Sequence, residues 1–391
     1  MTERYDLAVI GGGIHGAGVA QAAAAHGYSV LVLEQTALAA GTSSRSSKLI
    51  HGGLRYLESG HFKLVRECLQ ERALLLTLAP DLVRMRSFYL PLYRHTRRSP
   101  WQIRIGLSLY TLLAGLAKDT LFRSVPRREW EGLDGLNTDD LRAVYCYPDA
   151  QTDDAALTHA VMRSALSLGA RLEAPARIQQ AECGDDGVTL HYHDSQPRQC
   201  QVRVLVNAAG PWANDVLRRV RPSPPHCTVD LVQGTHILVP GQLRRGIYYL
   251  EAPRDRRAVF VMPWRDATLV GTTETVYRGD PAQVRPLPAE IDYLWETLAH
   301  YFPQHRQDER QLLDSFAGLR VLPARPGAPF SRSRETILLP DREHRPRVLT
   351  IYGGKLTAYR ATAAAVMTRL LPSLPDRTPI ADTRSLPLHP A

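Results

Sequence analysis

The sequence has 391 residues, of which 44% are hydrophobic, and a formal net charge of +9. The length suits two domains, and the apolar content excludes a wholly disordered chain. The basic excess indicates an anionic partner, either lipid headgroups or a phosphorylated substrate, and not nucleic acid, because no nucleic-acid-binding motif accompanies it.

The first predicted unit is a strand, a tight turn, a helix and a second strand within residues 5–34. The apolar run YDLAVI precedes a G-x-G-x-x-G turn, an alanine-rich helix follows, and the strand SVLVLE ends on an acid. Such a turn points helix N-terminal amides at a pyrophosphate, and the acid can hold a ribose. A glycine-rich turn without a ligand is the alternative. The residues predicted to contact a dinucleotide are Gly11, Gly12, Gly13, Ile14, His15, Gly16 and Glu34.

The five cysteines are scattered and form no C-x-x-C pair. They predict a reducing compartment, with neither a disulfide framework nor a zinc site. The first strand begins at residue 5, which leaves no room for a signal peptide. We therefore expect a cytoplasmic protein without a metal site.

The stretch 105–117, IGLSLYTLLAGLA, is apolar but shorter than the roughly 18 residues that span a membrane. Trp101 lies near it, and basic residues flank it on both sides: Arg97, Arg98, Arg104, Lys118, Arg123, Arg127 and Arg128. This pattern is typical of an amphipathic helix in a membrane interface. A buried core helix with a solvated basic rim fits it equally well, so both interpretations stay open.

Two further junctions between a strand and glycine follow along the chain. One is VRVLVNAAGPWA at 202–213, and the other is VLTIYGGKLTAYRATAAAVMTRL at 348–370. Because the carboxyl ends of parallel strands meet at one edge of a sheet, the three junctions can form one ligand site. Between them, 228–273 alternates apolar runs with breaks, which predicts an antiparallel sheet inserted into a discontinuous α/β domain. Residues from 372 onward predict a short polar, proline-rich tail.

The stretch 41–57, GTSSRSSKLIHGGLRYL, begins with hydroxyls and glycines that suit a loop around a large ligand. It is similar to the characteristic motif of the FAD-dependent, quinone-reducing glycerol-3-phosphate dehydrogenases, a membrane-associated family. The resemblance continues in order through LVNAAGPWAN, QGTHILVP, VFVMPW, LVGTTE, FAGLRVL and YGGKLTAYR. It covers residues 4–370.

The resemblance implies a Rossmann-type FAD-binding domain of the D-amino-acid-oxidase kind, with an inserted antiparallel-sheet substrate domain. The FAD-binding domain would comprise residues 1–85, 145–225 and 345–373. The substrate domain would comprise 226–344. Residues 86–144 would form a helical, basic segment that could contact a membrane.

The resemblance also implies FAD as the cofactor. A second helix start at Gly353 could point its positive end at the N1–C2=O edge of a flavin. Beyond the first glycine turn, the cofactor contacts that it implies are Thr42, Ser43, Ser47, Lys48, Leu49, Gly52, Arg177, Ala209, Gly210, Trp212, Gly354, Lys355, Leu356 and Thr357.

The implied activity is oxidation of sn-glycerol 3-phosphate to dihydroxyacetone phosphate, by hydride transfer from C2 to flavin N5, with electrons passed to a quinone. Arginine forks suit a phosphate, and an imidazole titrates near neutrality. The resemblance therefore implies Arg320 and Arg334 on the phosphate and His236 as the base, with Arg55 and Lys355 on the hydroxyls and the developing charge. The implied substrate-site residues are Arg55, Tyr56, His236, Thr272, Arg320, Arg334 and Lys355.

Two features depart from the family pattern. Its members usually continue with a helical C-terminal domain, whereas this chain ends at Ala391, so we expect a short form. LVGTTE carries Glu274 where the family typically has aspartate. An oxidase or dehydrogenase of another small 2-hydroxy acid or amine, and a non-catalytic flavin-binding relative, stay as alternatives. We expect a location in the cytoplasm, either free or peripheral on the inner face of the cytoplasmic membrane.

Overall fold

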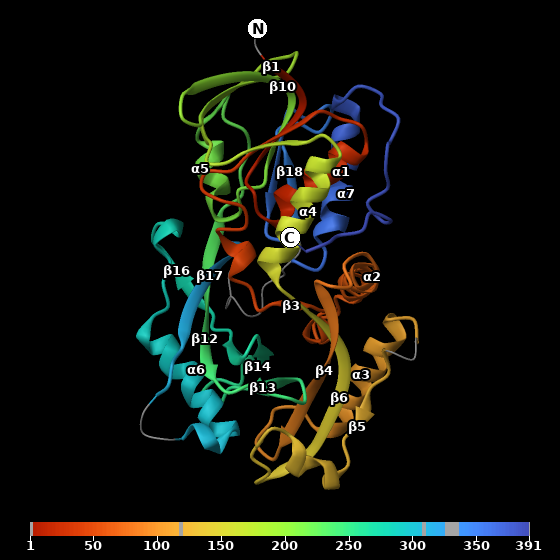
Figure 1. Ribbon diagram of the computed structural model, residues 1–391, viewed down its shortest axis with the longest axis vertical. Helices are drawn as coiled ribbons and strands as arrows, with labels where there is room; N and C mark the ends of the chain where they lie inside the picture. The colour runs from red at the N-terminus through yellow and green to blue at the C-terminus, as the bar shows by residue number, and fades with distance from the viewer. Residues whose placement is uncertain (1–2, 117–119, 307–309, 325–335, 391) are drawn as a thin grey trace.

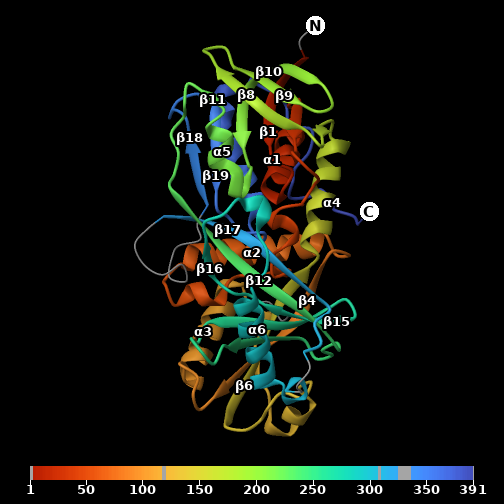
Figure 2. The same cartoon turned by 90° about the vertical axis from the view of Figure 1, so that its left-hand side faces the viewer.

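Within the residues that the structure describes, 3–116, 120–306, 310–324 and 336–390, two β-sheets organise the molecule. This computed structural model places one sheet toward each end of the long axis (Figure 1). The lower sheet contains a long antiparallel ribbon formed by β12 (Val229–Pro240) and β17 (Asp314–Pro323). Figure 2 shows this ribbon crossing the middle of the molecule.

The first sheet follows the order β11-β8-β9-β10-β1-β2-β7, with β19 beside β10 and β18 beside β19. Strands β7, β2, β1, β10 and β19 run parallel, and the register sets Ile10 beside both Leu33 and Asn207. Their carboxyl ends therefore share one edge. The strands of this sheet are β1 (Glu3–Ile10), β2 (Val30–Leu33), β7 (Arg171–Glu173), β8 (Arg177–Cys183), β9 (Val188–His193), β10 (Pro197–Asn207), β11 (Val220–Arg221), β18 (Ile337–Pro340) and β19 (Val348–Tyr352).

Both faces of the first sheet are covered, as a parallel sheet requires. Successive side chains of β1 alternate between the faces, so Leu7 and Val9 join one core, and Ala8 and Ile10 join the other. The short side chains of α1 let its neighbours approach closely. The helices on the first core are α1 (Ile14–Ala25), α4 (Asp154–Ser167) and α7 (Tyr359–Leu370), and α5 (Ala213–Leu217) lies on the second.

The second sheet follows the order β16-β12-β15-β14-β13-β4-β6-β3, with β17 beside β12 and β5 beside β6. It is antiparallel except between β13 and β4. Its other strands are β3 (Leu49–Ile50), β4 (Val83–Tyr93), β5 (Arg123–Ser124), β6 (Leu141–Thr152), β13 (Ile247–Glu251), β14 (Ala258–Trp264), β15 (Ala267–Gly271) and β16 (Thr275–Tyr277). Three helices pack on it: α2 (Phe62–Leu78), α3 (Pro100–Leu113) and α6 (Pro288–Tyr301).

Short 3-10 helices occupy several connections. They are η1 (Thr42–Ser44), η2 (Leu54–Leu57), η4 (Arg127–Gly132), η5 (Gly210–Trp212), η6 (Pro281–Gln283), η7 (Pro303–His305) and η9 (Leu371–Ser373).

The segment 86–144 differs from the helical segment expected from the sequence. It contains α3, but most of β4 and the first part of β6 also lie within it, and both strands belong to the second sheet. In the other direction, β18 falls within the range predicted for the substrate domain but pairs with β19 in the first sheet. Strand pairing therefore crosses the boundaries predicted between the domains. The domain limits themselves stay a prediction.

The C-terminal tail packs back on the ends of α1 and α2. The N–H of Ile380 donates to the carbonyl of Ala25 at 2.8 Å, and the N–H of Leu388 donates to that of Leu78 at 2.7 Å. Leu388 is 2% exposed and joins the core under α1 and α7. The tail is polar and proline-rich as predicted, but these contacts fix it to the body of the protein.

Candidate active site

A cavity of about 1030 Å³ is lined by both sheets and gathers segments that are far apart in sequence. The first sheet contributes the turns that follow β1, β2, β10 and β19, and the second contributes residues of β12, β14 and β17. Most of the loop 40–56 also lines it. The three glycine junctions predicted to converge therefore open into one cavity.

Glycine shapes the turn that follows β1. Gly11 has φ +112°, and a Cβ on Gly16 would overlap the carbonyl oxygen of Gly11, so side chains are excluded at this close approach. The N–H of Gly12 donates to Glu34 Oε2 at 2.7 Å, and that of Thr36 donates to Oε1 at 2.8 Å. The buried Glu34 thus ties the turn to the end of β2 while it also lines the cavity.

His15 meets Gly354 in the cavity wall. A Cβ on Gly354 would overlap the imidazole of His15, so the two motifs touch although 339 positions separate their numbers, 15 and 354. The Nδ1 atom of His15 is buried and has no hydrogen-bond partner in the described part of the chain. Burial lowers the pKa of His15 to about 4, so the ring is neutral at pH 7.

These features fit FAD. The cavity is at the upper end of ligand-pocket volumes, which reach about 1,000 Å³, and therefore suits a large cofactor together with a small substrate. The glycine turn presents the N-terminus of α1, where a pyrophosphate is favoured. The buried Nδ1 of His15 offers a polar atom that such a ligand can satisfy.

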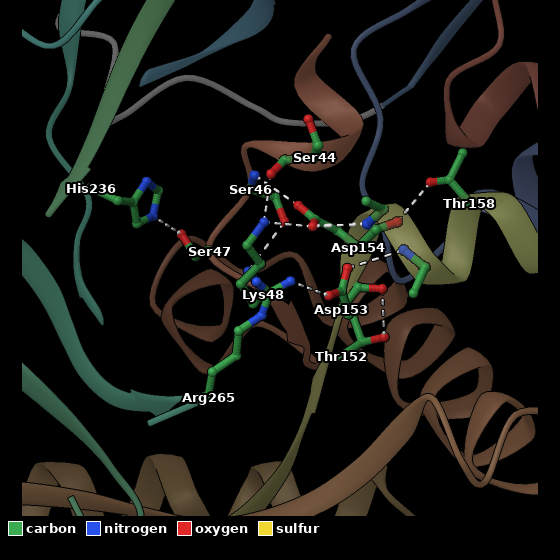
Figure 3. Close-up of polar contacts among 12 residues, drawn as sticks. Ser44, Ser46, Ser47, Lys48, Thr152, Asp153, Asp154, Thr158, His236 and Arg265 are labelled. Carbon is green, nitrogen blue, oxygen red and sulfur yellow. Dashed lines mark hydrogen bonds and ion pairs between the residues drawn. The ribbon is translucent and has the colours of Figure 1, made fainter. Parts of the chain in front are cut away.

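A buried ion pair organises the hydroxyl-rich loop (Figure 3). Lys48 Nζ lies 2.6 Å from Asp154 Oδ1, and the two side chains are 7% and 0% exposed. Asp154, in the first turn of α4, also accepts the N–H of Ser46 at 2.9 Å, and Lys48 Nζ donates to the carbonyl of Ser44. Lys48 does not line the cavity, and its side chain holds the loop through these contacts, so its assignment to the cofactor stays a prediction.

Ser47, on the same loop, faces the opposite way (Figure 3). Its Oγ lies 2.9 Å from Nε2 of His236 on β12, whose ring stacks on Phe316 with centroids 4.9 Å apart. His236 is 2% exposed, and its Nδ1 has no partner among the described residues. Burial, together with the charges of Arg320 and Lys48, holds the pKa of His236 well below its usual value. The imidazole is therefore neutral at neutral pH and can accept a proton.

Arg320 on β17 lies at the cavity wall within a polar cluster. Its Nη1 is 3.0 Å from Glu274 Oε1, and its Nη2 donates to Thr272 Oγ1 at 3.2 Å. The side chain of Arg320 is 22% exposed and lines the cavity. Glu274 places a carboxylate beside this arginine, which fixes the orientation of its fork and offsets part of its charge.

Two further cations, Lys355 and Arg55, lie beside the ring of Tyr56. Lys355 Nζ lies 3.7 Å from the centre of the Tyr56 ring and 3.8 Å from Cys68 Sγ. The guanidinium carbon of Arg55 lies 5.6 Å from the same ring. Both cations line the cavity, and together with Arg320 they make it suited to an anion.

The structure brings most residues assigned from the sequence to the cavity. Those that line it are Gly11, Gly13, Ile14, His15, Glu34, Thr42, Ser43, Ser47, Leu49, Arg55, Tyr56, Arg177, Ala209, Gly210, Trp212, His236, Thr272, Arg320, Gly354, Lys355, Leu356 and Thr357. Their individual roles stay predictions.

Four assigned residues do not line the cavity: Gly12, Gly16, Lys48 and Gly52. Gly16 makes room for the backbone of Gly11, whereas a Cβ on Gly12 would press on the side chains of Leu38 and Glu34. The N–H of Gly52 donates to the Tyr110 hydroxyl at 2.8 Å, and a Cβ there would press on Leu69, so this glycine serves packing. Arg334 lies outside the described residues.

Sequence reasoning missed several residues that shape the cavity. Arg45 and Ser46 line it from inside the loop motif, and Tyr249 and Phe260 line it from β13 and β14. Asp154 was missed although it is the partner of Lys48. The alternating pattern of the strands could have indicated the aromatic pair, whereas no local signal connects Asp154 with the loop.

Helix α3 exposes one apolar face. Trp101, Ile105 and Leu112 are 63%, 59% and 57% exposed, and at about 100° per residue they share one stripe. The opposite face is buried and consists of Ile103, Leu107 and Tyr110. One face of the helix is therefore core, while the other is an unusual exposed apolar stripe, and its contact with a membrane stays a prediction.

The basic flanks of α3 are not equivalent. Arg97 and Arg104 are exposed, whereas Arg98 pairs with Glu58 and with Glu251, the latter at 2.8 Å. Lys118 lies outside the described residues. Among the helices that the structure describes, none has both the length and the apolar content needed to cross a membrane.

Comparison with known proteins also identifies FAD-dependent oxidoreductases as relatives of this chain. Residues 6–360 match the family model for FAD dependent oxidoreductases. The glycerol-3-phosphate dehydrogenase of Pseudomonas aeruginosa is 39% identical over 95% of this chain and 72% of its own length. The D-erythritol 1-phosphate dehydrogenase of Brucella abortus is 38% identical over 94% of this chain and 74% of its own length.

A solved structure agrees with this kinship. The glycerol-3-phosphate dehydrogenase from Bacillus halodurans, complexed with FAD, superposes with a TM-score of 0.73 at 27% identity. The match covers 99% of this chain and 68% of that one.

Proposed function

Because this chain belongs to the FAD-dependent glycerol-3-phosphate dehydrogenase family, we propose that it oxidises sn-glycerol 3-phosphate to dihydroxyacetone phosphate. The observation that carries the proposal is the meeting of His236 with Arg55, Arg320 and Lys355 in the lining of one cavity. A neutral imidazole can take up a proton, and cationic side chains can hold a phosphate dianion.

In this proposal, different residues of the chain accept the proton and bind the phosphate. His236 accepts the proton of the C2 hydroxyl, because its low pKa leaves the ring unprotonated, and Ser47 holds the ring in place. Arg320 binds the phosphate with its N–H groups, while Thr272 and Glu274 keep its fork aligned. FAD, held by the glycine turn after β1 and by the segment after β19, would supply the acceptor for the hydride of C2.

The cations and rings around Tyr56 complete the site. Lys355 and Arg55 stabilise the negative charge that develops on the C2 oxygen as its proton leaves. Tyr249 and Phe260 line the same side of the cavity and exclude water from it. The position of each side chain in the lining supports the role proposed for it.

D-Erythritol 1-phosphate is a second candidate substrate. A relative named for it matches this chain at 38% identity, almost as well as the relative named for glycerol 3-phosphate at 39%. Both compounds are phosphorylated polyols, so the same arginines and the same base would serve either. Turnover must decide between them.

We further propose that a quinone receives the electrons and that the protein works on the inner face of the cytoplasmic membrane. Two observations support attachment: the exposed apolar stripe of α3 and the exposed Arg97 and Arg104 beside it. Apolar residues flanked by basic ones suit an anionic lipid interface, where a quinone is dissolved.

The test is anaerobic flavin absorbance of the purified protein with four compounds: glycerol 3-phosphate, erythritol 1-phosphate, 2-hydroxyglutarate and an amino acid. The proposal expects bleaching with glycerol 3-phosphate at the lowest concentration. Bleaching only by the carboxylates would refute it, and persistent colour with all four would indicate a non-catalytic flavin protein. Faster turnover with oxygen than with a quinone analogue would replace the quinone by an oxidase reaction.

A further inference from the structure

We infer that Glu290, which lies outside the cavity, is a positioning residue that holds Arg320 ready for the substrate's phosphate. The inference rests on the proposed function. Glu290 is the third residue of α6 and is 5% exposed. It does not line the cavity, so any influence on substrate passes through the residues that it contacts.

The carboxylate of Glu290 collects donors from three separate parts of the chain. Thr273 and Thr275 each donate a hydroxyl to Oε1 at 2.7 Å. Thr235 on β12 donates its hydroxyl to Oε2 at 2.6 Å, and Gln233 donates its amide to the same oxygen at 2.5 Å. The N–H of Leu287 donates to Oε2 as well, at 3.2 Å. One side chain therefore ties α6 to β12 and to the segment that joins β15 to β16.

The side chains at positions 272–275 point alternately toward Arg320 and toward Glu290. Residues 272–274 have no regular structure, and besides one backbone hydrogen bond, from the N–H of Thr273 to the carbonyl of Thr235 at 3.4 Å, side-chain contacts hold them in place. Thr273 and Thr275 turn toward Glu290, whereas Thr272 and Glu274 turn the other way and contact the guanidinium of Arg320. Successive side chains of an extended segment point in opposite directions, so fixing one set fixes the other.

Thr273 strengthens this link. Its hydroxyl donates to Glu290 and also accepts the N–H of Thr235 at 2.9 Å. Thr235 and Thr273 are 0% and 3% exposed, so these bonds are shielded from water. The segment is thus held against β12 at the point where β12 continues into His236.

The contacts call for a carboxylate. A carboxylate only accepts hydrogen bonds and offers about four lone-pair directions, whereas a glutamine amide accepts on one oxygen and donates from its nitrogen. Burial raises the pKa of Glu290, but the hydroxyls of Thr235, Thr275 and Thr273 and the Leu287 N–H outweigh it and lower the pKa. The group is therefore charged at neutral pH, and an amide in its place would lose or reverse some of these bonds.

The test is steady-state kinetics of the FAD-loaded Glu290→Gln variant with the substrate that bleaches the parent. We expect KM to rise about tenfold, which corresponds to about 1.4 kcal/mol, while kcat stays within about twofold and FAD content is unchanged. Glu290→Asp retains the charge and should recover part of the lost affinity. Leu294→Ala, in the buried face of the same helix, is the matched control: it should lower the melting temperature without raising KM.

A double-mutant cycle with Arg320→Ala decides whether Glu290 acts through Arg320. If it does, Glu290→Gln causes little further change in KM once Arg320 is gone. Additive effects, or a fall in kcat and FAD content that follows the melting temperature as in Leu294→Ala, would overturn the inference.

The inference can be separated from the proposed function by titrating the holoenzymes with inorganic phosphate and following the flavin spectrum. If none of the polyol phosphates is a substrate, the proposed function fails, but phosphate should still bind the parent more tightly than Glu290→Gln. Equal binding by the two proteins, or no phosphate-dependent change in the parent, would overturn the inference itself.

Discussion

The hydroxyl of Ser47 lies 2.9 Å from Nε2 of His236, and no other hydrogen bond to this imidazole is found within the described residues. The serine comes from the hydroxyl-rich loop before β3, and the histidine comes from β12 of the second sheet. The contact therefore couples the loop that borders the cofactor site to the candidate base. Ser47 is the residue through which the orientation of His236 can be tested.

Ser47→Ala should lower kcat about two- to tenfold, because it removes one hydrogen bond, worth about 0.5–1.5 kcal/mol, from the ring. The measurement is the rate of anaerobic flavin reduction at saturating substrate. Ser44→Ala is the matched control, since Ser44 belongs to the same loop but does not line the cavity. Equal losses in both variants would mean that the loop, and not the contact with His236, carries the effect.

Arg320→Ala should lower kcat/KM about 10–150-fold, because a hydrogen bond to a charged group is worth about 1.5–3 kcal/mol. FAD content should not change. Loss of flavin with unchanged KM would show that this arginine serves the cofactor instead of the substrate.

The same variant should also shift the pH profile. Burial and the charges of Arg320 and Lys48 keep the pKa of His236 well below 6.5, so the parent should retain activity into the acid range. Removing one of these charges raises that pKa, and the base is then protonated at a higher pH. The acid limb of the kcat/KM profile should therefore move upward in Arg320→Ala, and an unmoved limb would argue against His236 as the base.

Local patterns were sufficient to predict the nucleotide-binding half of the fold. The strand, the glycine turn and the acid at Glu34 stand within thirty residues of one another, and the structure brings them together at the end of β1 and β2. Spacing alone determines such a unit, because the turn geometry is set by Gly11 and Gly16 themselves. The fold class that the family resemblance implied is confirmed by the family match and by the two-sheet architecture.

The rest depends on contacts between distant positions. Lys48 was assigned to the cofactor because it stands in a cofactor motif, but its partner Asp154 is 106 positions further along the chain. Similarly, Glu290 is 55 positions from Thr235. The strand β4 was missed because both of its partners are distant along the chain: Val83 lies opposite Thr152 of β6, and Phe88 lies beside Ile247 of β13. A single sequence carries no local signal for such pairings.

Asp154→Asn should destabilise the protein strongly, by about 3–5 kcal/mol, because it leaves the Lys48 ammonium buried without its countercharge. The loop 44–48 then loses its anchor, so FAD content should fall as well. Thermal unfolding and the flavin-to-protein absorbance ratio measure the two effects.

Asp153→Asn is the control for this change. Asp153 caps α4 by accepting the N–H of Ala156 at 3.0 Å, and asparagine caps as well as aspartate, so this neighbouring change should cost little. Replacing both partners, with Lys48→Met and Asp154→Leu, removes the uncompensated charge and should recover much of the stability. If Asp154→Asn unfolds no more easily than Asp153→Asn, the ion pair does not organise the loop.

The exposed stripe of α3 gives the last prediction. Replacing Trp101, Ile105 and Leu112 together by serine should reduce binding to phosphatidylglycerol-containing vesicles more than about tenfold, because burying one large apolar side chain contributes about 1.5–3 kcal/mol. Flavin reduction by substrate should be unaffected, since none of the three lines the cavity. Flotation at low salt measures the bound fraction.

Two controls distinguish vesicle binding by this stripe from nonspecific binding by exposed apolar residues and from electrostatic binding. Leu166→Ser changes an apolar residue that is 38% exposed on α4, which packs on the first sheet, and should leave binding unchanged. Arg97→Gln with Arg104→Gln should weaken binding to anionic vesicles only, and high salt should mimic it, because both act on screened surface charges. Arg98 is left intact, since its ion pairs with Glu58 and Glu251 hold the loop before α3. If the parent protein does not float with anionic vesicles at low salt, the membrane assignment is wrong, and the stripe must be covered in some other way.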